Sequence, residues 1–582
     1  MEPIRDTQLN PVTLQVINSK LNGVVEEMQR IIYRTGYSTV IRESKDASAG
    51  ITDSKGRLIG QAFQLPLHIG VFTHAVNGIS SYYDESQIEN GDVFIVNHPY
   101  LGGSPHASDF IVATPFFHHG GILAYCCNIA HKADIGGMVP GSLTTKATEI
   151  FQEGLQIPPV KYFQRGKLSI DIENIIKSNS RIPDQIIGDL RGQVGCTLIG
   201  KQRLSQIVER YGADSVVAAA DETIRRTKTR LIALIRNIPE EEKESEGYLD
   251  HDGVDLTKPK RIHVKVGRQS DSFVFDFSKS DSQTKGSLNM RPTLLRAICN
   301  FATIAFLDPT LSSNHALFET VKIVTENGTI VDPRYPAAVS SYADIVRLSY
   351  HIVIDAVGKL FPSKAVACGG DNRGLNISGT DMTSSKRWIF YEILGSGQGA
   401  KQDSDGISGI SHFISNVAIT PIEIVETEFP IMISSFELIR DSGGAGKFRG
   451  GLGFRRSYHF LQDCTYVHRT GVFYLHAPWG LNHGKSGRTA TFSVIRANGS
   501  IEKINHVPGE YSMLKGDTVV VERPGGGGCG DSTLRNETNV IGDILDGYVS
   551  EEASLKEYGR TIESSVGEKS NSIGTMRIAP AN

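Results

Sequence analysis

Two short motifs of the form His-x-x-Asp constrain this chain most strongly. They are His106/Asp109 in YLGGSPHASDF and His131/Asp134 in NIAHKADIGG, and the second histidine lies 25 residues after the first. Each motif adjoins a glycine-rich turn, and the chain between them has the length and pattern of a strand, a turn and a strand. Imidazole and carboxylate groups suit a divalent metal that activates water. The motifs therefore predict neighbouring strand ends that carry polar, metal-binding side chains.

The surrounding sequence predicts further helices and strands. Apolar residues recur at three- and four-residue spacing from Leu14 to about Gly36, which predicts a helix, and a second helical region is expected at 214–238. Strands are expected at 46–52, 93–96, 110–115 and 122–129, each next to a turn sequence. Asp46 and both motifs fall at the ends of these strands, so residues far apart in sequence can meet at one rim of a sheet.

The length and pattern of the chain predict a multi-domain fold. A chain of 582 residues can bury several hydrophobic cores. Strands alternate with helices in the middle of the sequence, and the last part is rich in glycine and short strands. We therefore expect an α+β, or mixed α/β, fold with mixed sheets and a β-rich C-terminal region. The predicted parts are a metal-site domain at 1–250, a central α/β domain at 251–424, a β-rich region at 425–560 and a tail at 561–582.

Composition excludes several classes of partner and location. The net charge of −4 is mixed along the chain, whereas nucleic acids and anionic membranes require clustered Lys and Arg. The seven cysteines are odd in number and form no C-x-x-C, so neither a disulfide framework nor a cysteine zinc site is indicated. The first residues, MEPIRDTQLNP, lack the apolar core of a signal peptide, and no apolar run is long enough to cross a bilayer. We expect a cytoplasmic protein.

The candidate site residues have two interpretations each. Two imidazoles and two carboxylates, from Asp46, His106, Asp109 and His131, would suit Zn, Mn or Fe, but polar residues at strand ends are also common turn formers. His68 in LPLHIGVF is either a buried, hydrogen-bonded histidine or a residue that contacts substrate or supports the metal ligands. Asp134 either orients His131 or bonds to the turn that follows it.

Other catalytic motifs fail on their spacing. The segment GLNHGKSG resembles the end of a phosphate-binding P-loop, but Trp479 stands where that loop requires its first glycine. Cys126 and Cys127 lie inside an apolar strand, which favours packing over a reactive thiolate. The chain also contains no G-x-S-x-G nucleophile motif.

Taken together, the motifs resemble the hydantoinase B/oxoprolinase family from about residue 10 to residue 560. The blocks that carry the resemblance are IRESKDASAGI, QLPLHIG, VNHPYLGGSPHASDF, NIAHKADIGG, EIFQEGLQIPPVK, RDSGGAGKFRGGLGFRR, PGGGGCGD and GDILDGYVSEEASLKEYG. The family implies an activity divided between two polypeptides. A hydantoinase A-type ATPase partner, in an expected α2β2 assembly, would bind ATP with Mg and phosphorylate the substrate oxygen, while this chain would carry the metal.

The resemblance also implies roles for particular residues. The metal ligands would be Asp46, His106, Asp109 and His131, with Glu43 as the alternative to Asp46, and the preferred ion would be zinc, with manganese or iron as alternatives. A metal-bound water would open a cyclic amide such as a hydantoin, 5-oxoproline or a lactam. Asp109 would take part as a ligand, and Asp134 or His68 would support the ligands or accept a proton. The alternatives are a subunit of an ATP-dependent ketone carboxylase and a non-catalytic scaffold subunit.

Overall fold

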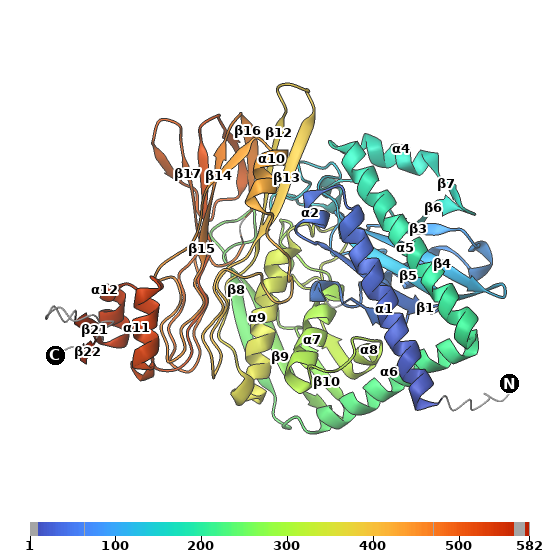
Figure 1. The fold of residues 1–582 in the computed structure, drawn as a ribbon, viewed down its shortest axis with the longest axis horizontal. Coiled ribbons are helices and arrows are strands. Elements are labelled where there is room, and N and C mark those ends of the chain that lie inside the picture. Colours follow the sequence, from blue (N-terminus) through green and yellow to red (C-terminus); the bar gives the residue numbers. More distant parts are fainter. Residues whose placement is uncertain (1–9, 63, 470, 564–576, 581–582) are drawn as a thin grey trace, which may run out of the picture.

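An antiparallel sheet forms the N-terminal part of the protein (Figure 1). The computed structural model describes residues 10–62, 64–469, 471–563 and 577–580. All neighbouring strands of this first sheet run antiparallel. Its seven strands are, in spatial order, β2 (Leu58–Gln61), β1 (Ala47–Asp53), β5 (Gly121–His131), β4 (Asp109–His118), β3 (Val93–Val96), β6 (Val160–Gln164) and β7 (Lys167–Leu168).

Helices cover both faces of this sheet. The predicted first helix is α1 (Pro11–Thr35), whose Asn10 side chain caps the helix by accepting a hydrogen bond from the backbone of Val12. Its apolar stripe packs with β1 and β5 and with the long helix α5 (Pro183–Tyr211) in one core. The opposite face is covered by α3 (Val71–Tyr82), so the sheet is buried on both sides.

Glycine explains why α5 escaped sequence-based prediction. The helix contains several glycines, which lower helix propensity and blur its periodicity. Two of them are needed for close packing: a Cβ at Gly188 would lie 2.6 Å from the ring of Tyr37, and one at Gly200 would lie 2.4 Å from the sulfur of Met28. The residues that obscure the helical pattern are therefore the ones that let α5 approach the first helix and the segment that follows it.

The hairpin of β4 and β5 sets the relative position of the two motifs. His118 pairs with Gly121 across a two-residue turn in which His119 and Gly120 have φ values of 47° and 85°. A β-bulge at Phe116 and Phe117 shifts the register by one residue, and the ladder beyond it places Asp109 directly opposite His131. The prediction of strand, turn and strand between the motifs is confirmed, and the register brings one residue of each motif together.

A second, mixed sheet lies in the middle of the molecule (Figure 1). Its order is β11 (Val321–Val324), β10 (Ser272–Asp276), β9 (Lys260–Gln269) and β8 (Lys243–Leu249), with a parallel pair between β10 and β11. The predicted helices α7 (Pro292–Leu307) and α9 (Tyr342–Leu360) share its core. The end of α6 (Ala213–Arg236) also enters this core through Ile224, Leu231 and Ile235. The acidic segment near the expected first boundary forms the edge strand β8, and the domain boundaries themselves stay a prediction.

Two antiparallel sheets share one core in the C-terminal part, as the glycine- and strand-rich sequence predicted. The first contains β13 (Arg387–Leu394), β12 (Arg373–Thr380), β16 (Cys464–His468) and β19 (Gly509–Met513). The second contains β14 (Ile431–Leu438), β15 (Phe454–Phe460), β20 (Thr518–Glu522), β17 (Thr491–Ile495) and β18 (Ile501–Lys503). The predicted α+β fold with mixed sheets and a β-rich C-terminal region is confirmed.

Shorter elements complete the fold. They are α2 (Thr39–Arg42), α4 (Ile170–Ser178), α8 (Ala316–Thr320), α10 (Ile422–Glu428), α11 (Glu537–Leu545), α12 (Glu551–Ala553), a one-turn π-helix (Ser554–Tyr558) and the pair β21 (Arg560–Glu563) and β22 (Arg577–Pro580). Most of the predicted tail, 564–576 and 581–582, lies outside the described residues.

Between the C-terminal sheets and α11, extended glycine-rich segments pack backbone against backbone. Gly526 donates its N–H to the carbonyl of Gly451, and Gly451 donates to the carbonyl of Gln398. A Cβ at Gly526 would lie 2.0 Å from the oxygen of Gln398, which no side chain tolerates. The GGLG and PGGGG sequences thus allow a bundle in which carbonyl groups contact Cα atoms. The rejected P-loop segment, around Gly484, belongs to the same bundle.

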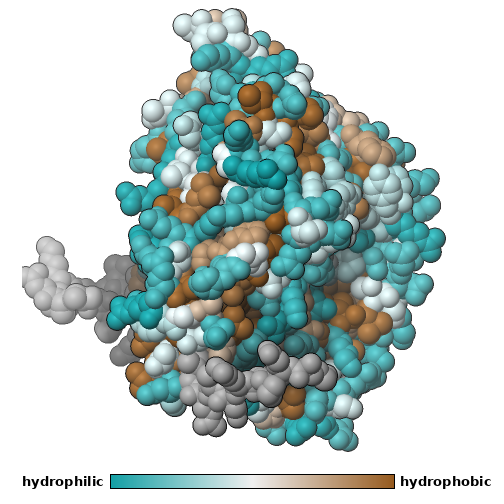
Figure 2. Space-filling model, turned by 90° about the vertical axis from the view of Figure 1, so that its right-hand side faces the viewer, coloured by the Kyte–Doolittle hydropathy of each residue, from teal (hydrophilic) through white to brown (hydrophobic). Residues whose placement is uncertain are grey.

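The surface is mixed in character. Figure 2 shows the face that carries the N-terminal part, where apolar side chains form separate patches among polar ones. Within the described ranges, no helix has both the length and the apolar composition that crossing a bilayer requires.

Candidate metal centre

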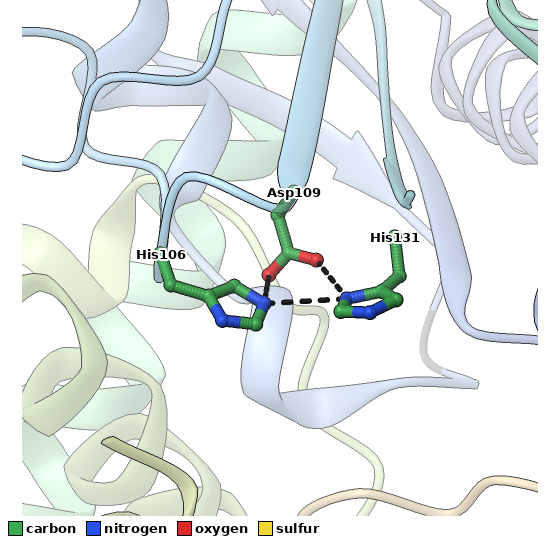
Figure 3. A group of neighbouring side chains, drawn as sticks. All are labelled: His106, Asp109 and His131. Atoms are coloured by element: carbon green, nitrogen blue, oxygen red, sulfur yellow. Dashed lines mark hydrogen bonds and ion pairs between the residues drawn. The ribbon is translucent and has the colours of Figure 1, made fainter. Parts of the chain in front are cut away.

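Two histidines and one aspartate meet where β4 begins and β5 ends (Figure 3). His106 Nε2 lies 3.2 Å from Asp109 Oδ2, and His131 Nδ1 lies 3.0 Å from Asp109 Oδ1. The two ring nitrogens are 3.2 Å apart. Among the described residues, they form the only group of three or more His, Cys, Asp or Glu side chains whose ligand atoms all lie within 4.8 Å of one another. We refer to His106, Asp109 and His131 as the triad.

The triad fits a bound cation. Two imidazole nitrogens at 3.2 Å cannot both direct lone pairs at each other unless a proton or a metal ion lies between them. The Nδ1 atom of His106 donates to the carbonyl oxygen of Ser340 at 3.3 Å, so this tautomer leaves Nε2 free as a ligand. The donor set of two imidazoles and a carboxylate is the one that catalytic zinc sites use, with a further position open for water.

The charges of the triad are strongly coupled. Burial disfavours a carboxylate, yet the two imidazoles hold the pKa of Asp109 well below its usual value. Burial would lower the pKa of His106, but the charge and hydrogen bond of Asp109 outweigh it and raise the pKa. Burial lowers the pKa of His131. These shifts favour a neutral His131 and an ionised Asp109, the forms in which both bind a metal, and a bound metal would displace any proton from His106 Nε2.

Backbone contacts hold the loop that presents His106. The side chain of Asn97 donates to the carbonyls of Ala107 (2.7 Å) and Leu155 (2.8 Å) and accepts from Ile157 (2.6 Å). These bonds tie the NHPYLGGSPHAS loop to residues 155–157, which lead into β6, the strand next to β3. On the other side, the backbone N–H of Lys132 donates to the carbonyl of Ser108 at 2.7 Å. The loop therefore has a fixed conformation beside the end of β5.

Glu153 supports His106 from behind. Its Oε1 accepts from the backbone N–H groups of Val339 (2.7 Å) and Ser340 (2.6 Å), and Ser340 in turn receives the hydrogen bond from His106. Burial raises the pKa of Glu153 to about 7. No prediction from the sequence assigned a role to this residue, although the block EIFQEG that contains it was part of the family resemblance.

Aromatic rings from distant segments enclose the imidazoles. The ring of Tyr342, at the start of α9, meets His106 edge-on at 4.9 Å between ring centroids. The ring of Tyr391, in β13, stacks on His131 at 4.7 Å. Alternate residues of β13 face the N-terminal core, and this alternation directs Tyr391 toward the triad. The first sheet, α9 and the C-terminal strand β13 thus all contribute side chains to the site. The sequence did not indicate that these segments meet.

Asp46 lies near the triad without joining its tight cluster. Burial raises the pKa of Asp46 to about 7, and the negative charge of Asp109 adds to the effect. The backbone carbonyl of Asp46 accepts from the N–H of His131 at 3.2 Å, so its main chain is fixed against the end of β5. The alternative carboxylate, Glu43, is engaged at 2.7 Å by the neighbouring Arg42. The structure therefore places Asp46, rather than Glu43, within electrostatic reach of Asp109.

Asp134 organises the loop after β5. Its Oδ1 accepts from Gly141 N (3.0 Å) and from Arg181 Nη1 (2.8 Å). Its Oδ2 accepts from Arg181 N (2.7 Å) and Gly136 N (3.3 Å). With both oxygens occupied by donors and an ion pair to Arg181, the carboxylate is committed to holding this loop. Of the two interpretations of the sequence, the bond to the following turn is the one that the structure shows.

His68 lies in a short 3-10 turn (Pro66–His68) and is buried next to the triad. Its Nδ1 is 2.9 Å from the hydroxyl of Ser48 in β1. Burial, together with the nearby imidazoles of His106 and His131, lowers the pKa of His68 to about 4 and outweighs the opposing charge of Asp109. The side chain is therefore neutral at pH 7.

The cysteines show no sign of nucleophilic reactivity. Cys126 and Cys127 are buried in β5, and burial raises the pKa of both thiols. A protonated thiol is a poor nucleophile, so the expectation of inert packing is supported.

Comparisons with known proteins identify the family and the fold of this chain. The family model of hydantoinase B/oxoprolinase matches residues 10–532. The chain is 34% identical to an uncharacterised protein of Methanocaldococcus jannaschii, over 94% of this chain and 96% of that one. It is 30% identical to a putative B-type subunit of a D-/L-hydantoinase from Pseudomonas sp., over 96% of both chains.

Solved structures share the fold over nearly the whole length. The crystal structure of the ATP-dependent caprolactamase from Pseudomonas jessenii superposes with a TM-score of 0.88 at 26% identity, over 97% of this chain and 98% of that one. A nucleotide-free acetone carboxylase structure gives the same TM-score at 18% identity, over 97% of this chain and 81% of that one, which shows a common fold. The chain belongs to the hydantoinase B/oxoprolinase family.

Proposed function

We propose that this chain is the metal-binding component of an ATP-dependent cyclic amide hydrolase. The observation that carries the proposal is the buried triad, in which two imidazoles and a carboxylate converge at 3.0–3.2 Å. Relatives named as a hydantoinase and a caprolactamase support cyclic amides as the substrate class. Zinc is the preferred ion for this donor set, with manganese and iron as alternatives.

The triad and Asp46 would hold the ion. A bound divalent metal supplies a Lewis acid that lowers the pKa of water into the physiological range. The Ser340 carbonyl and Glu153 keep His106 in the tautomer that exposes Nε2. His68, neutral and fixed by Ser48, would accept a proton near the reacting atoms, while Asp134 holds the loop that follows the ligand His131.

A partner would supply the activation that an unstrained amide needs. An ATPase of the hydantoinase A type would bind ATP with Mg and phosphorylate the amide oxygen, in an expected α2β2 assembly. One water then opens the ring at the C–N bond and a second takes the phosphoryl group, so that a ring-opened amino acid, ADP and phosphate leave. The placement of ATP binding on the partner is supported by the GKS segment of this chain. That segment lies in the glycine bundle and not in the strand-loop-helix arrangement of a phosphate-binding P-loop.

A second candidate is a subunit of an ATP-dependent ketone carboxylase, favoured by the fold shared with acetone carboxylase. The two functions make opposite demands on bicarbonate. A carboxylase consumes ATP only when bicarbonate and a ketone are both present, whereas a hydrolase consumes it with a cyclic amide alone.

The test is an ATP-consumption assay on the complex co-purified with its ATPase partner. Hydantoin, 5-oxoproline and caprolactam are supplied without bicarbonate, and acetone is supplied with and without it. Ring-opened product formed in step with ADP supports the proposal. Turnover that requires bicarbonate identifies the carboxylase, and a complex that purifies without metal and without either activity identifies a scaffold role.

A further inference from the structure

A cluster of buried arginines lies beside the metal centre, on the side of β13. Arg347 belongs to α9, Arg373 begins β12, Arg469 follows β16 and Arg523 follows β20. At most 6% of each residue is exposed. We refer to these four residues as the arginine cluster.

The arginine cluster has too few carboxylates. Asp371 pairs with Arg373 at 3.1 Å and also with Arg523, and Asp344 pairs with Arg373 at 3.1 Å and more loosely with Arg347 at 3.7 Å. Two carboxylates thus serve three guanidinium groups. Arg469 pairs with no carboxylate among the described residues.

Several guanidinium donors in the cluster have no acceptor. The buried Nε–H groups of all four arginines lack a hydrogen-bond partner, as does Nη1 of Arg523. Buried polar groups are almost always hydrogen-bonded, so these donors are available to an acceptor that the protein itself does not supply. A buried cation without a counterion is costly, and an anionic ligand removes that cost.

Arg469 contacts an aromatic ring that also contacts the triad. Its guanidinium lies 5.9 Å from the ring centroid of Tyr391, and the same ring stacks on His131 at 4.7 Å. Gly374 makes room for this arrangement, because a Cβ there would lie 2.2 Å from Arg469 Nη2 and 2.9 Å from the Tyr391 hydroxyl. One aromatic ring, hydrogen-bonded through its hydroxyl to Arg469, therefore separates a guanidinium that has no carboxylate partner among the described residues from a candidate metal ligand.

We propose that Arg469, with the arginine cluster behind it, binds an oxyanion carried by the substrate beside the triad. This inference rests on the proposed function and narrows its substrate class to an amide that bears a carboxylate or has received a phosphoryl group. Both anions present the paired oxygens that a guanidinium fork recognises. A neutral cyclic amide without either group would make no use of Arg469.

The test measures equilibrium binding to the full chain by calorimetry, without ATP or partner. The ligands are inorganic phosphate, 5-oxoproline, and 2-pyrrolidinone, which has the same ring as 5-oxoproline without its carboxylate. The wild-type chain should bind at least one of the two anions. Arg469→Gln should weaken that binding about 10- to 100-fold and leave 2-pyrrolidinone unchanged, and Arg469→Lys should lie between them.

A matched control and a stability measurement separate recognition from a structural role. Arg455→Gln removes an arginine of β15 whose side chain is 40% exposed and paired with Glu522, and it should leave the binding of all three ligands unchanged. A purely structural Arg469 would instead lower the Tm of the Gln variant and leave its anion affinity as in the wild type.

Each binding result supports or overturns the inference. Selective loss of phosphate binding assigns the site to a phosphoryl group, and selective loss of 5-oxoproline binding assigns it to a substrate carboxylate. A wild-type chain that binds neither anion, or an Arg469→Gln chain that binds them as well as the wild type, overturns the inference. Because no turnover or metal enters the measurement, failure of the proposed hydrolase function would leave this result intact.

Discussion

The two aspartates of the His-x-x-Asp motifs should respond in opposite ways to the same substitution. Asp134→Asn is expected to destabilise the fold, because each oxygen of Asp134 accepts from two N–H donors. An amide has only one acceptor, so in either orientation its NH2 group would face two N–H groups. The change also breaks the ion pair between buried Asp134 and partly exposed Arg181. Removing one partner of a fully buried pair costs about 3–5 kcal/mol, which is the upper limit for this substitution.

Asp109→Asn should spare the fold and remove the metal. Asp109 contacts only the two imidazoles of the triad through its side chain, and loss of its charge removes the only carboxylate of that cluster. The assay combines metal per chain, by elemental mass spectrometry, with Tm after treatment with a chelator, so that bound metal does not contribute to stability. The reasoning is refuted if Asp134→Asn is as stable as the wild type, or if Asp109→Asn keeps its full metal content.

Three further substitutions test other parts of the structure. Gly526→Ala should prevent stable folding, because its Cβ would lie 2.0 Å from a carbonyl oxygen. The control, Gly542→Ala in α11, meets nothing within 4 Å and should raise Tm slightly. Equal Tm values for the two variants would contradict the packing of the glycine bundle. Glu153→Ala should weaken metal binding about 10- to 100-fold in a competition titration. Glu153→Gln keeps an acceptor for the N–H groups of Val339 and Ser340, so its metal affinity should be near that of the wild type. Equal losses of affinity in the two variants would contradict the role of Glu153 in positioning His106. Burial lowers the pKa of His351 to about 3, so the folded state keeps it neutral while the unfolded state protonates it below about pH 6.5. The contribution of neutral His351 to the free energy of unfolding should therefore be fully present above pH 6.5 and fall by up to about 1.4 kcal/mol per pH unit toward pH 3. In thermal melts, a His351→Asn chain should lose stability less steeply over this range. Identical pH profiles for the two chains would contradict the assignment.

Local sequence patterns predicted the hairpin and its ligands for a physical reason. Strand periodicity, a two-residue turn and an antiparallel ladder are local features, so the spacing between the motifs was enough to expect Asp109 and His131 at neighbouring strand ends. The same patterns predicted the first helix, where the apolar stripe is regular. They failed for α5, where glycines required by close packing interrupt the pattern.

Long-range contacts set the limit of what the sequence can predict. Tyr391, in β13, contacts the triad, and Arg469, directly after β16, contacts Tyr391; no spacing in the sequence predicts these contacts. Asp109 and Asp134 occupy the same position in identical motifs, yet one points between two imidazoles and the other into a turn closed by Arg181. The distinction depends on the paths of the loop before β4 and of the loop after β5, which are tertiary properties.

The most direct test of the metal centre is the metal content of the chain purified with its partner from metal-replete medium. The wild-type complex should carry about one divalent ion per copy of this chain, as expected for a mononuclear site. His106→Ala should reduce this to a small fraction, while His118→Ala, at the far end of β4, the strand that begins at Asp109, should retain it. A wild-type complex without bound metal, or a His106→Ala complex with the wild-type content, would contradict the assignment of the triad as the metal site.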